Sequence, residues 1–243
     1  MARMTLDDLV AQLKRAYGDA LRAVVLYGSA AGGDHVPEKS DYNVLVVADA
    51  LGMAQLRAVA ATARAWAEAG HPPPMTLTTE EWRASADVFP MEYADLLERH
   101  RVLHGALPLD GIRVDPRDLR VEVEQQTLGK LLQLRTAIVS TGWEPKRLLA
   151  LLEASLGTFM TVFRGVARLH GERPPADREA LARWVGARAG FDAAPFVRVA
   201  QHVKGAPRLS PDAAAGILEQ YLAAMERLVT HVDRFDAPHP PAA

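Results

Sequence analysis

Leu26-Tyr27-Gly28-Ser29 is followed, after eleven further residues, by Asp41-Tyr42-Asn43, and these two motifs are the clearest indication of the fold. A short, uninterrupted apolar run leads into the first motif and predicts a buried strand. A second run, which continues through Val47, starts within the other motif and predicts another strand. Because side chains two residues apart on a strand lie on the same face, Asp41 and Asn43 are expected to point together toward the turn between the strands.

This pattern resembles the signature of the nucleotidyltransferase superfamily, which includes DNA polymerase β, over roughly residues 20–105. In that family a glycine-serine turn precedes a strand that carries two carboxylates two residues apart. The resemblance implies that Gly28 and Ser29 bind the phosphates of a nucleoside triphosphate such as ATP, because glycine lets the backbone approach them closely. It also implies that Asp41 and Asn43 are catalytic and bind Mg²⁺, which would align the attacking hydroxyl and neutralise the leaving group.

The chain departs from the family pattern at two positions. The second carboxylate is replaced by Asn43, whose amide oxygen is neutral and binds two metal ions poorly. The third carboxylate of the family lies on the following strand, where we place Thr76 of Met75-Thr76-Leu77. One carboxylate in place of three neutralises two divalent cations poorly, so the sequence leaves it open whether the chain is an active enzyme.

The second half of the chain differs from the first because no strand is predicted beyond Pro116. Helical spacing of apolar residues is found from there to about Phe235, and the segment 146–169 is apolar almost all round, which is typical of the central helix of a bundle. The predicted fold class is therefore α+β. A small mixed-sheet nucleotidyltransferase domain spans residues 1–112, an all-α helical bundle domain spans residues 113–236, and residues 237–243 form a proline-rich tail expected to be disordered.

This order of domains is similar in architecture to kanamycin and other aminoglycoside nucleotidyltransferases, in which a helical bundle follows the catalytic domain. In those enzymes a glutamate of the bundle acts as general base on the acceptor hydroxyl, which makes Glu124 the candidate here and Glu122 its substitute. We place Glu124 on an apolar stripe of the helix 118–140, formed by Val121, Leu128, Leu131 and Ile138. The alternative is an ion pair on the helix surface between Arg120 and Glu124, which are four residues apart.

Composition narrows the function classes further. The chain has no cysteine, so disulfides, thiolate metal sites and cysteine nucleophiles are excluded. A net charge of -2 makes a nucleic acid an unlikely partner, since such binding rests on a basic surface. No signal peptide and no run of 18 apolar residues is found, so we expect a cytoplasmic protein that has no membrane partner.

Three functions remain open from the sequence. The first is transfer of a nucleotidyl group from a nucleoside triphosphate to a hydroxyl of a small molecule, with magnesium. The second is a catalytically inactive nucleotidyltransferase fold that acts as a nucleotide-binding or protein-interaction module of a regulatory or antitoxin-like kind. The third is a helical interaction protein with an unrelated α/β cap. The helices also leave a homodimer open, because periodicity does not separate an exposed interface from a core.

Overall fold

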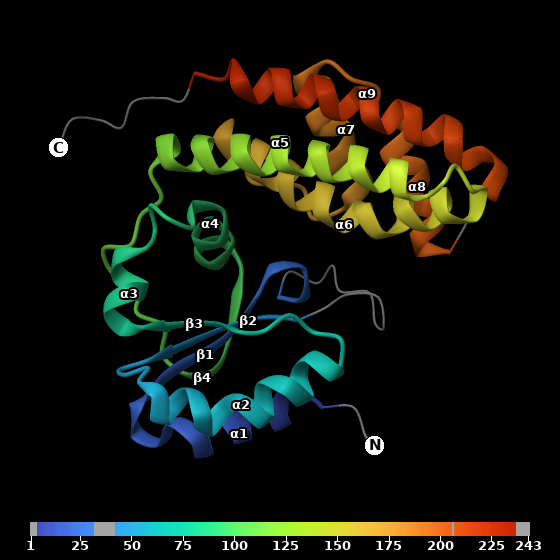
Figure 1. Ribbon diagram of the computed structural model, residues 1–243. Coiled ribbons are helices and arrows are strands. Elements are labelled where there is room, and N and C mark those ends of the chain that lie inside the picture. The colour runs from blue at the N-terminus through green and yellow to red at the C-terminus, as the bar shows by residue number, and fades with distance from the viewer. Residues whose placement is uncertain (1–3, 32–41, 206, 237–243) are drawn as a thin grey trace. The chain divides into compact units, whose positions relative to one another are not determined.

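The computed structural model describes residues 4–31, 42–205 and 207–236. The chain divides into two compact units, which we call the sheet unit (Met1–Val114) and the helical unit (Asp115–Ala243) (Figure 1). Each unit has its own secondary structure and is described by itself below. The predicted tail at 237–243 lies outside the described residues.

The sheet unit is built on four strands. They are β1 (Leu21–Tyr27), β2 (Asn43–Ala48), β3 (Met75–Thr78) and β4 (His100–Gly105), and their order in the sheet is β3-β2-β1-β4. Strand β1 runs antiparallel to both β2 and β4, whereas β2 and β3 are parallel, so the sheet is mixed. The two central strands, β1 and β2, are the ones predicted on either side of the glycine-serine turn. Every residue from Val44 to Ala48 is buried.

Helices cover both faces of this sheet. Helices α1 (Leu6–Tyr17) and α2 (Met53–Glu68) cover one face, and α3 (Thr79–Ala84) and α4 (Pro90–Glu98) cover the other (Figure 1). Alternate residues of the central strands serve the two faces. Those on the α1–α2 face are Val24, Leu26, Val44 and Val46, and those on the α3–α4 face are Ala23, Val25, Leu45 and Val47. The same alternation sets the face of the sheet on which a polar side chain at a strand end lies.

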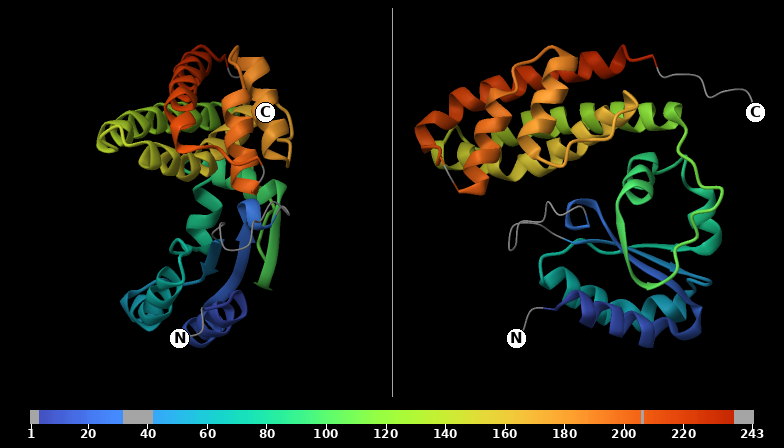
Figure 2. Two further views of the ribbon diagram at one scale, coloured as in Figure 1. Left: turned by 90° about the vertical axis from the view of Figure 1, so that its right-hand side faces the viewer. Right: turned by 180° about the vertical axis from the view of Figure 1, so that it is seen from behind.

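The helical unit consists of long helices around one central helix. The described elements are α5 (Pro116–Ser140), α6 (Pro145–Leu169), α7 (Arg178–Ala189), α8 (Ala194–Lys204), the short 3-10 helix η3 (Pro211–Ala213) and α9 (Ala214–Asp233), which Figure 2 shows from two further sides. Helix α6 contacts α5, α7, α8 and α9, and it buries residues along its whole length. The predicted fold class, a small mixed-sheet domain followed by an all-α domain, is confirmed.

Helix α6 is also long and apolar enough to cross a membrane, judged by length and composition alone. It is the single helix of the described residues that meets this criterion. The central helix of a bundle has the same composition, because it is surrounded by other helices on most sides. The sequence predicted this central role for the segment.

The predicted apolar stripe of α5 is wrong at Val121 and Leu128, whereas Leu131 of the same stripe is buried. Val121 is 61% exposed and Leu128 is 45% exposed, so they do not face the interior of the helical unit. The buried side is instead formed by Leu119, Val123, Thr127, Leu131 and Leu134. Because Thr127 is polar, the sequence pattern does not indicate that this side of α5 is buried. The Thr127 hydroxyl donates to the Val123 carbonyl oxygen at 2.5 Å, so it is satisfied within its own helix.

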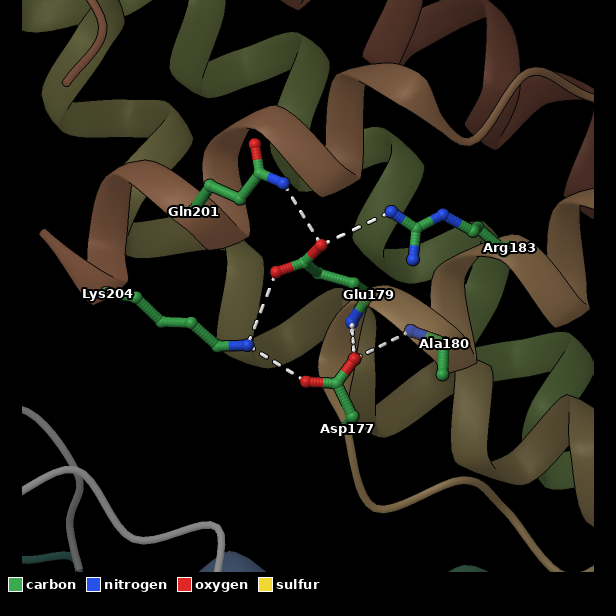
Figure 3. A network of polar contacts seen from close by, with 6 residues as sticks. All are labelled: Asp177, Glu179, Ala180, Arg183, Gln201 and Lys204. Atoms are coloured by element: carbon green, nitrogen blue, oxygen red, sulfur yellow. Dashed lines mark hydrogen bonds and ion pairs between the residues drawn. The ribbon is translucent and has the colours of Figure 1, made fainter. Parts of the chain in front are cut away.

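A polar network joins the start of α7 to the end of α8 (Figure 3). The Lys204 ammonium donates to Asp177 Oδ2 at 2.9 Å and to Glu179 Oε1 at 3.3 Å. Glu179 also accepts from Arg183 and Gln201. The hydrogen bond from Lys204, together with the backbone N–H of Ala180, holds the pKa of Asp177 below its usual value of 3.8. The network therefore ties two helices together through an N-cap carboxylate.

The variant Lys204→Met is expected to lower the free energy of unfolding by about 0.2–1 kcal/mol at pH 7, because the ion pairs are about half exposed and screened by water. A carboxyl group with a lowered folded pKa stabilises the fold above pH 3.8, and that stabilisation is lost as the pH falls through the folded pKa. Denaturant titration should therefore find the difference at pH 7 and find it abolished well below pH 3.8. Lys146→Met is the control, since no ion pair of Lys146 is found among the described residues, and an equal loss in both variants would contradict the prediction.

Candidate functional site

The turn after β1 requires a glycine at its first position. Strand β1 ends at Tyr27, and the 3-10 helix η2 (Gly28–Ala30) follows it directly. Gly28 is buried and has a φ of +74°, a conformation that side chains of L-amino acids rarely adopt. The backbone N–H of Ala31 closes the turn by donating to the Gly28 carbonyl oxygen at 3.2 Å.

Asn43 and this turn are brought together. Asn43 is the first residue of β2 and pairs with Tyr27, the last residue of β1. Its side-chain amide lies against Gly28, because a Cβ atom added at Gly28 would be 3.0 Å from Asn43 Nδ2. The pleat sends Tyr42 to the other face, where it packs against the core of α1 and α2. The amide of Asn43 therefore faces the glycine turn, as expected from the sequence.

The structure does not describe the side chains of two further residues of the predicted site. Asp41 lies outside the described residues. Ser29 belongs to η2, but its side chain is outside what the structure describes. Their roles as metal-binding and phosphate-binding residues stay predictions.

The sequence placed the third carboxylate position at Thr76, and that placement is wrong. Thr76 pairs with Val46, which belongs to the α1–α2 face, so Thr76 lies on the opposite face from Asn43. Its hydroxyl donates to the Pro74 carbonyl oxygen at 3.1 Å. The positions of β3 on the face of Asn43 are Met75 and Leu77, which pack against the α3–α4 core. Thr76 was placed on the wrong face because a shift of one residue along a strand moves a side chain to the other face.

Asn43, Tyr27 and His100 form a row across the sheet next to the turn, and the sequence did not predict this row. Tyr27 pairs with Asn43 on one side and with His100 of β4 on the other. Burial, with the charges of Glu92 and Asp95 from α4, raises the pKa of Tyr27 to about 12. The phenol is therefore neutral and able to donate a hydrogen bond over the physiological range. The row joins residues that lie far apart in the sequence, so no local pattern could have revealed it.

His100 is held in this row by a hydrogen bond. Its Nδ1 atom is 2.6 Å from the Leu96 carbonyl oxygen, which can only accept, so Nδ1 carries a hydrogen and donates it. The spacing of His100 and His104 suggests a metal pair, but His100 pairs with Tyr27 and His104 with Val24, with an irregular register between them. No group of three or more histidine, aspartate or glutamate side chains that could hold a metal is found in the described part of the chain.

The strand residues that the structure describes do not form a site for two magnesium ions, although Glu92 and Asp95 of α4 lie close enough to act on the Tyr27 phenol. On the face that carries Asn43, the sheet offers a neutral amide, a phenol and an imidazole, and β3 offers only apolar side chains at Met75 and Leu77. Asn43 could supply one uncharged oxygen to a single ion. No reaction step is therefore derived through a pair of metal ions.

Glu124 lies in the helical unit and is held by a neighbour. Arg120 forms an ion pair with it, with 2.8 Å between Nη1 and Oε2, and Arg120 also donates to the backbone carbonyls of Asp233 and Phe235. This is the surface ion pair that the sequence offered as the alternative to catalysis. The inward stripe that suggested a catalytic Glu124 is not present, so its role as a general base stays a prediction without support from burial.

A pocket of about 740 Å³ lies in the helical unit, along α9. None of the predicted site residues lines it. Its walls are formed by Ala189, Ala223, Glu226, Arg227, Thr230, His231, Arg234, Phe235 and Asp236.

Comparison with known proteins supports the fold but not a closer relationship. No protein-family model matches the chain, and a search of curated proteins finds no match. Among solved structures, the spectinomycin adenyltransferase AAD(9) from Enterococcus faecialis, determined with ATP and spectinomycin, superposes with a TM-score of 0.60 at 9% sequence identity. The match covers 94% of this chain and 98% of that chain. The chain thus shares the fold of that structure, a small mixed-sheet domain followed by a helical domain, and nothing in the match singles out a kanamycin-type member.

Proposed function

We propose that the chain binds a nucleoside triphosphate at the Gly28–Ser29 turn and transfers its nucleotidyl group to a hydroxyl of a small molecule. The observation that carries this proposal is the contact between Gly28 and Asn43. A buried glycine with positive φ keeps the turn free of a side chain. The Asn43 amide next to it can donate a hydrogen bond to a phosphate oxygen or bind a metal ion through its own oxygen. The structure of AAD(9) contains ATP and a small-molecule acceptor, which agrees with this class of ligands.

The roles of the remaining residues follow from this proposal. Asp41 and Asn43 would supply one charged and one neutral oxygen to a single magnesium ion, which when bound would neutralise charge on the triphosphate. Ser29 would donate to a phosphate oxygen, and Glu124 would accept the proton of the acceptor hydroxyl. The cytoplasmic location and a homodimer stay predictions from the sequence.

A second candidate function is nucleotide binding without transfer. It is favoured by the uncharged Asn43 and by the apolar Met75 and Leu77, which occupy the face on which further carboxylates would be needed. A single carboxylate holds metal ions less well than three do, so less of the negative charge that develops in nucleotidyl transfer is neutralised, and each lost factor of ten in rate corresponds to about 1.4 kcal/mol. Such a chain would act as a regulatory module that senses a nucleotide.

Calorimetric titration with ATP and GTP, with and without magnesium, tests the proposal and separates the two candidates. Binding that needs magnesium and is lost in Asp41→Ala, with release of pyrophosphate when acceptors are added, supports the transferase. Binding that is independent of magnesium, without pyrophosphate release, supports the sensor. A natural chain that binds neither triphosphate would rule out both.

The variant Asn43→Asp is expected to raise the magnesium-dependent affinity for the triphosphate by about tenfold, because a second carboxylate adds a charged ligand. Asn43→Ser also removes the amide but adds no charge, so it is the control for loss of the natural side chain. Titration of both variants at several magnesium concentrations measures the effect. Equal affinity of Asn43→Asp and Asn43→Ser would show that no metal ion approaches this position.

The variant Gly28→Ala is expected to weaken triphosphate binding by at least about tenfold. Alanine at a φ of +74° costs about 1–2 kcal/mol, and its Cβ atom must also displace the Asn43 amide from 3.0 Å. Gly18→Ala is the matched control, because Gly18 also has a positive φ but no atom within 4 Å of its added Cβ. Both variants should lose stability in thermal unfolding, but only Gly28→Ala should lose affinity.

A further inference from the structure

His71 contacts the strand that carries the proposed site from the opposite face of the sheet. It follows α2, directly before the prolines that lead to β3, and only 8% of its surface is exposed. Its ring lies 4.2 Å from that of Trp66 and 4.9 Å from that of Tyr42, measured between centroids. Trp66 is fully buried and is itself fixed by a hydrogen bond of 3.0 Å from Nε1 to the Pro72 carbonyl oxygen. The imidazole is thus held in one place from several sides.

The imidazole also bonds to the backbone of this strand. The backbone N–H of Tyr42 donates to His71 Nδ1 at 3.4 Å, across 29 residues of sequence. Because an N–H group can only donate, Nδ1 must carry its lone pair, and the hydrogen of the neutral ring sits on Nε2. The pairing of β2 with β1 begins one residue later, at Asn43. His71 therefore extends the ordered backbone of β2 beyond the end of the ladder.

We propose that His71 is a positioning residue for the nucleotide site. This inference rests on the proposed function, in which Asn43, the residue directly after Tyr42, lies against the turn. On one face, His71 and Trp66 hold the backbone and ring of Tyr42. On the other face, the Asn43 amide lies against Gly28. A fixed Tyr42 sets the direction of its neighbours, since adjacent residues of a strand point to opposite faces.

The role does not require His71 to touch the nucleotide. Its ring packs among residues of the α1–α2 face, whereas Asn43 belongs to the face covered by α3 and α4. Loss of the acceptor would leave the Tyr42 N–H without this bond and would let the entry to β2 shift. A shift of the polar groups by a fraction of an ångström is enough to weaken the binding of a triphosphate. His71 therefore acts by positioning the residues that bind the nucleotide, and it takes no part in the reaction.

Two variants of similar size separate this role from general packing. In His71→Asn, the amide oxygen lies close to the position of Nδ1 and can still accept from the Tyr42 N–H. In His71→Leu, the side chain fills the space but cannot accept. We expect His71→Leu to weaken ATP binding about tenfold, as for a lost hydrogen bond that fixes a site, and His71→Asn to stay within about threefold of the natural chain.

Hydrogen exchange of the backbone amides provides the second measurement. Faster exchange at Tyr42 in His71→Leu, with normal exchange in His71→Asn, is expected because only the first variant loses the acceptor. Equal ATP affinity of the natural chain and His71→Leu, with faster exchange at Tyr42, would overturn the inference and leave the proposed function intact. An equal loss of affinity in both variants would also overturn it, since packing would then explain the effect. A natural chain that binds no ATP would overturn the proposed function, and the inference with it.

Discussion

Replacement of Gly105 by alanine is expected to destabilise the sheet unit strongly. Gly105 ends β4, pairs with Ala23 of β1, and has a φ of +71°. A Cβ atom at this position would lie 1.8 Å from the carbonyl oxygen of Arg22 and 2.8 Å from its carbonyl carbon. These are backbone atoms, and the Arg22 carbonyl is held in place by the N–H of Ala106 at 3.1 Å. The two strands must separate to accept a methyl group.

The expected cost is about 3 kcal/mol or more, of which about 1–2 kcal/mol comes from the positive φ and the rest from the displaced pairing of β1 and β4. Denaturant unfolding followed by fluorescence of Trp66 and Trp82, both fully buried in the sheet unit, would measure it. The control is Gly111→Ala, because Gly111 has a φ of +79° and no atom within 4 Å of its added Cβ. A similar loss of about 1 kcal/mol in both variants would mean that the close approach at Gly105 is relieved without cost.

The sequence predicts the sheet unit well where the signal is local. Unbroken apolar runs at Ala23–Leu26 and Val44–Val47 need no partner to be recognised as buried strands. The turn between them is also local, because Gly28 is the residue type that a positive φ demands. The contact between Gly28 and Asn43 follows from these two features and from the period of a strand.

The rest depends on register and on pairings between distant segments. The face of Thr76 is set by its partner Val46, and a short strand of four residues carries too little pattern to fix that register. The buried side of α5 could not be predicted because Thr127 satisfies its hydroxyl within its own helix. The bond between His71 and Tyr42 and the row from Asn43 to His100 join segments that have no shared sequence motif.

In the helical unit, Phe196→Ala is expected to cost about 3–5 kcal/mol. Phe196 of α8 is fully buried at the centre of an aromatic cluster. Ring centroids of its neighbours lie at 4.0 Å for Tyr221, 5.0 Å for Phe163, 5.7 Å for Phe191 and 6.1 Å for Phe159. Removal of the ring leaves a cavity that these large and mutually packed side chains cannot fill without leaving their rotamers.

Tyr221 provides the contrasting variant within the same cluster. It is fully buried, burial raises the pKa of its phenol, and its hydroxyl has no hydrogen-bond partner among the described residues. Tyr221→Phe removes a polar atom and keeps the ring, so its free energy of unfolding should be unchanged or higher by about 1 kcal/mol. Chemical denaturation of the three chains would measure both effects. If Phe196→Ala lost less than about 1 kcal/mol, or if Tyr221→Phe were strongly destabilised, the aromatic cluster would be less tightly packed and more hydrated than the structure shows. Domains of this kind are stable by only about 5–15 kcal/mol, so a loss of the expected size in Phe196→Ala would remove a large share of that stability.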